Sequence, residues 1–106
     1  MDVTHISHPH QQITCMDNAR AYEAEDGSIT VLAELLSLAS LVVEDIRVYV
    51  VLKGELAELL SIEEVEIGSL YPEEQRPIKV QISPQGGEVM LVQVYLSHPP
   101  ASTGSI

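Results

Sequence analysis

Three histidines and one cysteine near the N-terminus are the side chains of this chain best suited to bind a metal ion. His5, His8 and His10 follow an H-x2-H-x-H spacing, and Cys15 lies five residues beyond. Imidazole and thiolate suit zinc, copper or nickel. The spacing matches no standard structural zinc site, which draws four ligands in a paired arrangement. We therefore expect residues 1–16 to form a poorly ordered leader, with metal handling by the histidines as an alternative.

Acidic side chains gather in the middle of the chain and could offer oxygen ligands to calcium. Glu63, Glu64 and Glu66 follow Glu55 and Glu58, but no D-x-D-x-D-G loop is present. In a strand, Glu64 and Glu66 share one face and Glu63 points to the other. This alternation favours a solvated acidic face over a metal site.

No arrangement of nucleophile and base is visible in the sequence. The G-x-S-x-G elbow of serine hydrolases is absent, and Cys15 has its nearest histidines in the expected leader, which could not hold a catalytic geometry. Glu44 and Asp45 are adjacent, so in an extended chain their carboxylates point apart. We therefore predict no catalytic residue, no cofactor and no enzymatic activity.

The charge balance argues against two classes of partner. The 106 residues include 16 acidic and 5 basic side chains, a formal net charge of −11. Nucleic acids and anionic lipid surfaces normally require a cluster of Lys and Arg residues. We therefore expect neither as a partner, and the acidic surface favours solubility.

The sequence indicates neither a membrane segment nor an export signal. No apolar run approaches the ~18–20 residues of a transmembrane helix, and residues 1–12 lack the basic start and apolar run of a signal peptide. The single cysteine excludes an internal disulfide framework. We expect a soluble chain, either a whole protein or one domain of a longer one, and the sequence does not indicate its compartment.

The clearest secondary-structure signal lies in residues 45–53, DIRVYVVLK. Every second position is apolar from Ile46 to Leu52, and most of the intervening positions are charged or polar. A strand sends successive side chains to opposite faces, so this pattern predicts a strand with one buried face.

Four other segments also have features of strands. Residues 77–83 alternate strictly, residues 88–96 are apolar on both faces, and residues 18–24 and 63–70 give shorter patterns. An Asp-Gly pair at 26–27 predicts a hairpin turn after the first of them. We expect loops or turns between the predicted strands at residues 71–74 and 84–87.

Residues 29–40, ITVLAELLSLAS, fit two structures. As a strand, alternate residues from Ile29 to Leu35 share a face; as a helix, the leucines from Leu32 onward line one side up to Val43. The β-branched start after a hairpin signal, and the direct run into the strand at 45–53, favour the strand. The state of residues 32–43 stays open between the two.

Five to seven short strands at regular spacing predict an all-β fold, an antiparallel immunoglobulin-like β-sandwich of about seven strands. Its core must be aliphatic, because the chain has no Phe or Trp. We predict a leader at residues 1–16, a sandwich domain at 17–97 and a flexible tail at 98–106.

The order VLAELLSLAS, VEDIRVYVVLKG, EIGSLYPEEQRPIKVQISP and VMLVQVYL resembles the immunoglobulin-like modules of the CARDB and NEW3 type. In such modules an IG-x-L-x-P-G-E turn precedes an alternating strand. Residues 67–74 match this turn except at Glu73, where glycine is usual, so the backbone geometry there stays open. The similarity covers residues 29–96. It implies a spacer, adhesion or binding module without catalysis, as in surface proteins of bacteria and archaea.

Two observations point to a partner surface. Tyr49 and Tyr95 occupy the less apolar positions of their strands, as sheet-surface packing or as part of a binding face. Residues 89–96 and 32–43 also hold more apolar side chains than one core face needs; exposed, the excess would form an interface, and covered, it would be core. We expect a non-catalytic interaction or spacer module of an envelope or multidomain protein. The alternative is an intracellular adaptor that homodimerises through its apolar strands.

Overall fold

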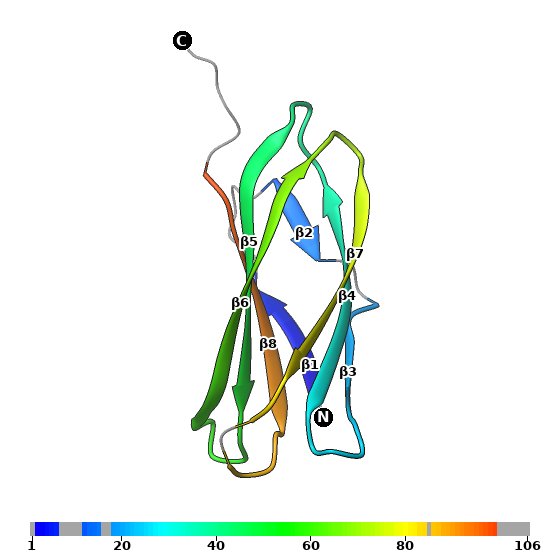
Figure 1. The fold of residues 1–106 in the computed structure, drawn as a ribbon. Helices are drawn as coiled ribbons and strands as arrows, with labels where there is room; N and C mark the ends of the chain where they lie inside the picture. The colour runs from blue at the N-terminus through cyan, green and yellow to red at the C-terminus, as the bar shows by residue number, and fades with distance from the viewer. Residues whose placement is uncertain (1, 7–11, 16–17, 85, 100–106) are drawn as a thin grey trace.

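Eight strands in two facing sheets make up the computed structural model, which describes residues 2–6, 12–15, 18–84 and 86–99 (Figure 1). The first sheet has the order β1 (Asp2–Ile6), β8 (Leu91–Ser97), β5 (Val43–Lys53) and β6 (Leu59–Leu70). In the second sheet β4 (Ile29–Ser37) is central. It pairs along one edge with β2 (Ile13–Cys15) and then β3 (Arg20–Glu23), and along the other with β7 (Gln75–Ile82).

The core lies between the two sheets and is aliphatic, as the composition predicts. The alternate apolar residues of β5 from Ile46 to Leu52 are fully or almost fully buried. Their neighbours on β8, from Val92 to Leu96, point to the same side. Each fully buried Val, Leu or Ile side chain contributes about 1.5–3 kcal/mol relative to an exposed one. The prediction of an all-β sandwich is confirmed.

Residues 29–37 form a strand, which settles this part of the ambiguous segment. Ile29, Val31, Ala33 and Leu35 face the core at no more than 4 % exposure, as the strand reading requires. Strand partners on both edges of β4 supply the backbone hydrogen bonds that a helix would have formed internally. Residues 38–42 then connect β4 to β5, and the part of the chain that the structure describes contains no helix.

Tight turns end several strands where the sequence predicts them. In the β3–β4 hairpin, Gly27 has a φ of 87°, and its N–H donates to the carbonyl of Ala24 at 3.0 Å. The Asp26 carboxylate accepts hydrogen bonds from the backbone N–H and the hydroxyl of Ser28. The following strand begins directly after these contacts, so the turn sets its register.

The first 16 residues differ most from the prediction, because two strands lie where no element is expected. β1 pairs in parallel with β8, from Asp2 opposite Leu91 to Ile6 opposite Tyr95. β2 buries Ile13 and Cys15 in the core. Both segments are too short to show a period, and the partner of β1 lies almost 90 residues away. The sandwich therefore begins before residue 17, and residues 100–106 of the predicted tail lie outside the described part.

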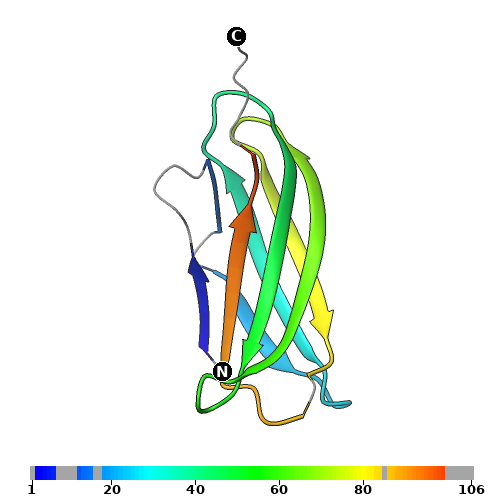
Figure 2. The same ribbon diagram turned by 90° about the vertical axis from the view of Figure 1, so that its left-hand side faces the viewer.

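The sandwich is elongated, with extents of 49 × 22 × 20 Å. One end carries the β4–β5 and β6–β7 connections, and we refer to it as the loop end. The opposite, hairpin end carries the β3–β4, β5–β6 and β7–β8 connections (Figures 1 and 2). β1 begins at the hairpin end and β8 finishes at the loop end. No helix able to cross a membrane occurs in the described residues.

Candidate interaction surface

The histidine cluster lies mostly outside the described residues. His8 and His10 lie outside the described residues, and for His5 only the backbone is described, in β1 opposite Val94. Cys15 is buried in β2. Within the described ranges, no three His, Cys, Asp or Glu side chains come together as metal ligands would.

The glutamates of β6 divide between the two faces as the alternation predicts. Glu64 and Glu66 lie opposite Tyr49 and Arg47 on the outer face, and Glu63 lies opposite the buried Val50. The Arg47 guanidinium is 3.5 Å from the Glu64 carboxylate and 3.7 Å from that of Glu66. A hydrogen bond with Tyr49, and then these two carboxylates, raise the pKa of Arg47. Glu64 and Glu66 therefore form ion pairs with Arg47 on an open sheet surface.

Glu44 and Asp45 lie at the loop end and are exposed. The β5–β6 register shifts between Val43 and Ile46, and Asp45 has a φ of 55°. The pair thus forms part of a β-bulge, a feature that bends the strand carrying it and increases its twist.

A groove of about 740 Å³ lies at the loop end. One wall is formed by residues 36–40, at the end of β4 and in the connection that follows. The other is formed by Pro72, Glu73 and Gln75. We name it the loop-end groove, and its volume is in the range of about 300–1,000 Å³ that is typical of binding pockets.

Large apolar side chains stand exposed on the two connections that form this groove. Leu38 is 63 % exposed, Leu41 56 % and Tyr71 64 %. The β4–β5 connection passes from one sheet to the other; Ala39 within it and Val43 at the start of β5 are buried in the core. Its leucines are left on the outside. Three such residues on two adjacent connections are the kind of patch that marks an interaction site.

One hydrogen bond joins the two walls of the groove, and others fix each wall separately. The N–H of Ser37 donates to the carbonyl of Glu74 at 3.0 Å, and the N–H of Leu38 donates to that of Gln12 at 2.7 Å. The Glu74 carboxylate accepts from the N–H of Tyr71 at 2.9 Å and from the Arg76 guanidinium at 2.7 Å. Both contacts lower the pKa of Glu74, and the hydrogen bond from Tyr71 has the larger effect. The groove is therefore largely pre-formed, which lowers the entropic cost of binding.

The turn at Glu73 has the backbone geometry that is usual with glycine at this position. Pro72 precedes it, the N–H of Glu74 donates to the carbonyl of Tyr71 at 3.0 Å, and Glu73 itself has a φ of 63°. Glycine adopts this left-handed conformation without steric cost, whereas other residues are strained in it. The exposed Glu73 side chain consequently stands at the rim of the groove.

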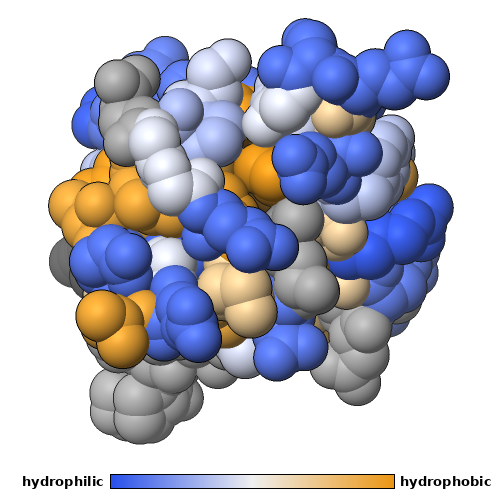
Figure 3. All heavy atoms as spheres, turned by 90° about the horizontal axis from the view of Figure 1, so that it is seen from below, coloured by the Kyte–Doolittle hydropathy of each residue, from blue (hydrophilic) through white to orange (hydrophobic). Residues whose placement is uncertain are grey.

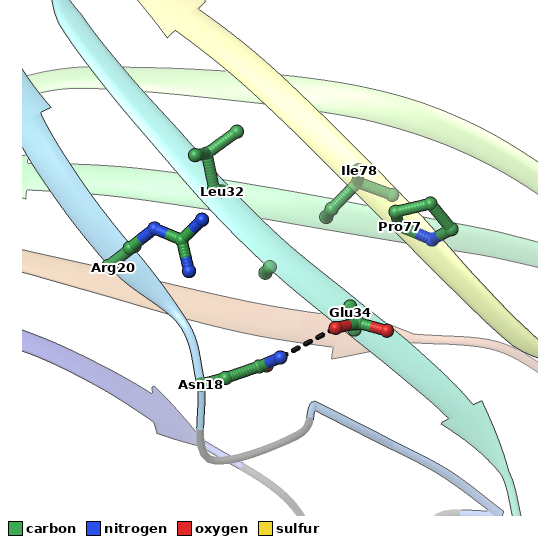
Figure 4. A pocket seen from close by; sticks show the side chains of 7 residues that line it. Asn18, Arg20, Leu32, Glu34, Pro77 and Ile78 are labelled. Carbon is green, nitrogen blue, oxygen red and sulfur yellow. Dashed lines mark hydrogen bonds between the residues drawn. The ribbon is translucent and has the colours of Figure 1, made fainter.

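A smaller hollow of about 150 Å³ lies on the outer face of the second sheet (Figure 4). Arg20 points over it, and Leu32 and Pro77 supply an apolar wall. The Glu34 carboxylate accepts a hydrogen bond from the amide of Asn18 at 2.6 Å. Its volume is below that of ordinary ligand pockets, so it is a weaker candidate than the loop-end groove.

The hairpin end is less favourable than the loop end. Leu56, Leu59 and Met90 are exposed there. Hydrophilic side chains interrupt the apolar ones on this end of the molecule (Figure 3). A hollow between the β3–β4 turn and the β7–β8 connection lies beside Glu23 and Glu88, whose carboxylates make it polar.

The apolar excess that the sequence shows is distributed over several places. In residues 89–96 it is mostly core, and Leu91 and Tyr95 lie on the outer face of the first sheet. In residues 32–43, Leu38 lines the loop-end groove, and Leu41 is exposed on the same connection. The sequence carried this signal as surplus leucines, but it could not show that Tyr71 would join them.

Comparison with protein-family models, with curated proteins and with solved structures finds no match to this chain.

Proposed function

We propose that this chain is a non-catalytic interaction module, an immunoglobulin-like sandwich that binds a partner protein at its loop end. The observation that carries the proposal is the loop-end groove, with Leu38 exposed in its lining and with Leu41 and Tyr71 exposed on the two connections that form its walls. Fully burying one such side chain contributes about 1.5–3 kcal/mol. Three together can anchor a partner segment of modest length.

The charges around the groove define the partner further. Glu73 lies at its rim, and Glu44 and Asp45 stand exposed at the same end. The chain as a whole has a net charge of −11. A partner segment with apolar side chains flanked by Lys or Arg is complementary to this arrangement, because opposite charges speed association and select the partner.

The shape of the molecule supports a position within a larger assembly. The strands nearest the two chain ends, β1 and β8, begin and finish at opposite ends of an axis of 49 Å. A module joined to neighbours at both ends would separate them by about that length. Such a module of an envelope or multidomain protein would present the loop end close to the domain that follows it.

A peptide titration followed by amide chemical shifts tests the proposal. The probes are extended peptides with two leucines and a tyrosine flanked by lysines, and the matched probes carry glutamates in place of the lysines. We expect the lysine peptides to shift amides of residues 36–41 and 71–75, and the glutamate peptides to bind more weakly.

Two variants complete the design. Leu38→Ser should weaken binding of the lysine peptides by about tenfold, which corresponds to 1.4 kcal/mol. Leu56→Ser changes an even more exposed leucine, 86 % exposed, at the hairpin end, and should leave binding unchanged. Absence of shifts at the loop end with every peptide, or equal loss in both variants, would overturn the proposal.

A further inference from the structure

The outer face of the first sheet carries a second surface that the loop end does not involve. Tyr49 on β5 lies directly opposite Tyr95 on β8, and Val51 lies opposite Gln93. On the other side of β5, Val51 lies opposite Ile62 of β6. We name this surface the tyrosine face, and its members are the outward residues of three strands. They are Arg47, Tyr49, Val51 and Lys53 of β5; Ile62, Glu64 and Glu66 of β6; and Leu91, Gln93 and Tyr95 of β8.

The centre of the tyrosine face is apolar. Val51 is only 9 % exposed although it points away from the core, and it lies on the central strand between Ile62 and Gln93. Ile62 beside it is 55 % exposed. The hydroxyl of Tyr95 donates to the side-chain oxygen of Gln93 at 3.1 Å, which holds both side chains along the sheet. An ordered aromatic and aliphatic centre with an Arg residue at its margin has the composition of an interface core.

The tyrosine face is also balanced in charge, unlike the chain as a whole. It holds two of the five basic residues, Arg47 and Lys53, and two of the sixteen acidic ones, Glu64 and Glu66. Asp2 on β1 pairs directly with Leu91 and adds one carboxylate to the same side of the sheet, so this side is close to neutral; Glu44 lies beyond Arg47. Two chains of net charge −11 repel each other. The repulsion is smallest where each presents a neutral surface.

We infer that the tyrosine face binds the same face of a second copy of this chain. A two-fold axis that reverses the strands would place the apolar centres of the two copies together. It would also bring Lys53 of one copy to the end that holds Glu64 and Glu66 in the other. An unlike partner would need no such neutrality, since a basic protein would gain from the acidic remainder of the surface.

The size of the face sets the strength of this dimer. Seven residues of β5 span about 20 Å, and three strands span about 10 Å. Even with the relief of the side chains, two such faces bury less than the roughly 1,200 Å² of a stable interface. The dimer is therefore weak, with dissociation in about the micromolar to millimolar range.

Sedimentation equilibrium of the full chain tests the inference, over protein concentrations from about 10 µM to about 1 mM. We expect an average mass that rises from monomer toward dimer. The substitution Ile62→Lys should raise the dissociation constant at least about tenfold, because it puts a charge into the apolar centre. Leu41→Lys is the matched control, since Leu41 is equally exposed, at 56 %, and receives the same charge at the loop end.

A strict monomer at all concentrations would overturn the inference, and so would a dimer that the two variants weaken equally. Ile62 is exposed, so its substitution should leave the fold intact. A second measurement uses the unmodified chain: diluting it should shift the amides of β5, β6 and β8 and not those of the loop end. Shifts confined to the loop end would overturn the tyrosine face while leaving the proposed function standing.

Discussion

At the scale of single residues, the turn between β6 and β7 contains the most informative position. Glu73 holds a left-handed backbone conformation, with a φ of 63°, in a turn where its side chain is exposed. Strain at a non-glycine residue in this region is about 1–2 kcal/mol, and the greater freedom of glycine in the unfolded chain offsets part of it. Glu73 is therefore not the most stable residue for this position. In exchange, its carboxylate stands at the rim of the loop-end groove.

Replacing Glu73 with glycine should stabilise the protein. We expect Glu73→Gly to raise the free energy of unfolding by about 0.5–1 kcal/mol, as relief of strain exceeds the entropic cost. Urea denaturation monitored by circular dichroism measures the change. Glu73→Ala is the control, since it removes the carboxylate and keeps the strain; a gain of equal size in the alanine variant would contradict the explanation.

Glu74 should make part of the stability depend on pH. Its pKa is lowered by the N–H of Tyr71 and by Arg76, so the folded state binds the proton less tightly than the unfolded state. The contribution is present above the unfolded pKa and is lost as the pH falls through the lowered, folded pKa. Between about pH 5 and pH 2, Glu74→Gln should therefore lose less stability than the unmodified chain.

Urea titrations at several pH values measure this difference. Asp26, whose pKa is lowered by its hydrogen bonds from Ser28, should leave a residual acid dependence in the variant. Asp26→Asn is thus the matched control, acting at the opposite end of the sandwich. Identical acid dependence in Glu74→Gln and the unmodified chain would show that the Tyr71 and Arg76 contacts do not stabilise the charged form.

At the scale of elements, the sequence predicts strands well where an apolar period of two is long enough to be seen. The alternation from Ile46 to Leu52 and from Ile78 to Ile82 corresponds directly to the inward positions of β5 and β7. In β4 the same pattern is overlaid by leucines on the outer face, such as Leu32 and Leu36. Local propensity then supports a helix as well. Tertiary pairing decides the outcome.

The elements that the sequence does not predict depend on distant parts of the chain. β1 has five residues and contributes Val3 to the edge of the core. Its ladder is formed entirely with β8, so no local pattern could reveal it. The loop-end groove is similar, because Leu38 and Pro72 come from connections more than 30 residues apart.

Two adjacent leucines in β4 test its orientation. Leu35 is fully buried between the sheets, whereas Leu36 lies on the outer side and is partly exposed. Leu35→Ala should cost about 2–5 kcal/mol of unfolding free energy through the cavity it leaves, and Leu36→Ala should cost about 1 kcal/mol or less. Thermal or urea unfolding measures both. Similar losses in the two variants would indicate that both side chains share one face, as in a helix.

At the scale of the whole molecule, the two proposed surfaces are compatible. The loop-end groove lies at one tip of the long axis, and the tyrosine face lies along the flank of the first sheet. A dimer formed through the flank leaves both tips free for partners. A single chain would then offer one loop end, and a pair of chains would offer two, which strengthens binding to a multivalent partner without any new contact.

The parallel pairing of β1 and β8 has a mechanical consequence. Because β1 begins at the hairpin end and β8 finishes at the loop end, tension between Asp2 and Ser97 pulls the two strands past each other along their length. All the hydrogen bonds of the ladder are then loaded together, whereas strands pulled from one end separate bond by bond. In single-molecule stretching, we expect a higher rupture force for pulling at residues 2 and 97 than for pulling at residues 2 and 91. If the forces were equal, the ladder would not resist extension, and a tether built from such modules would yield elsewhere.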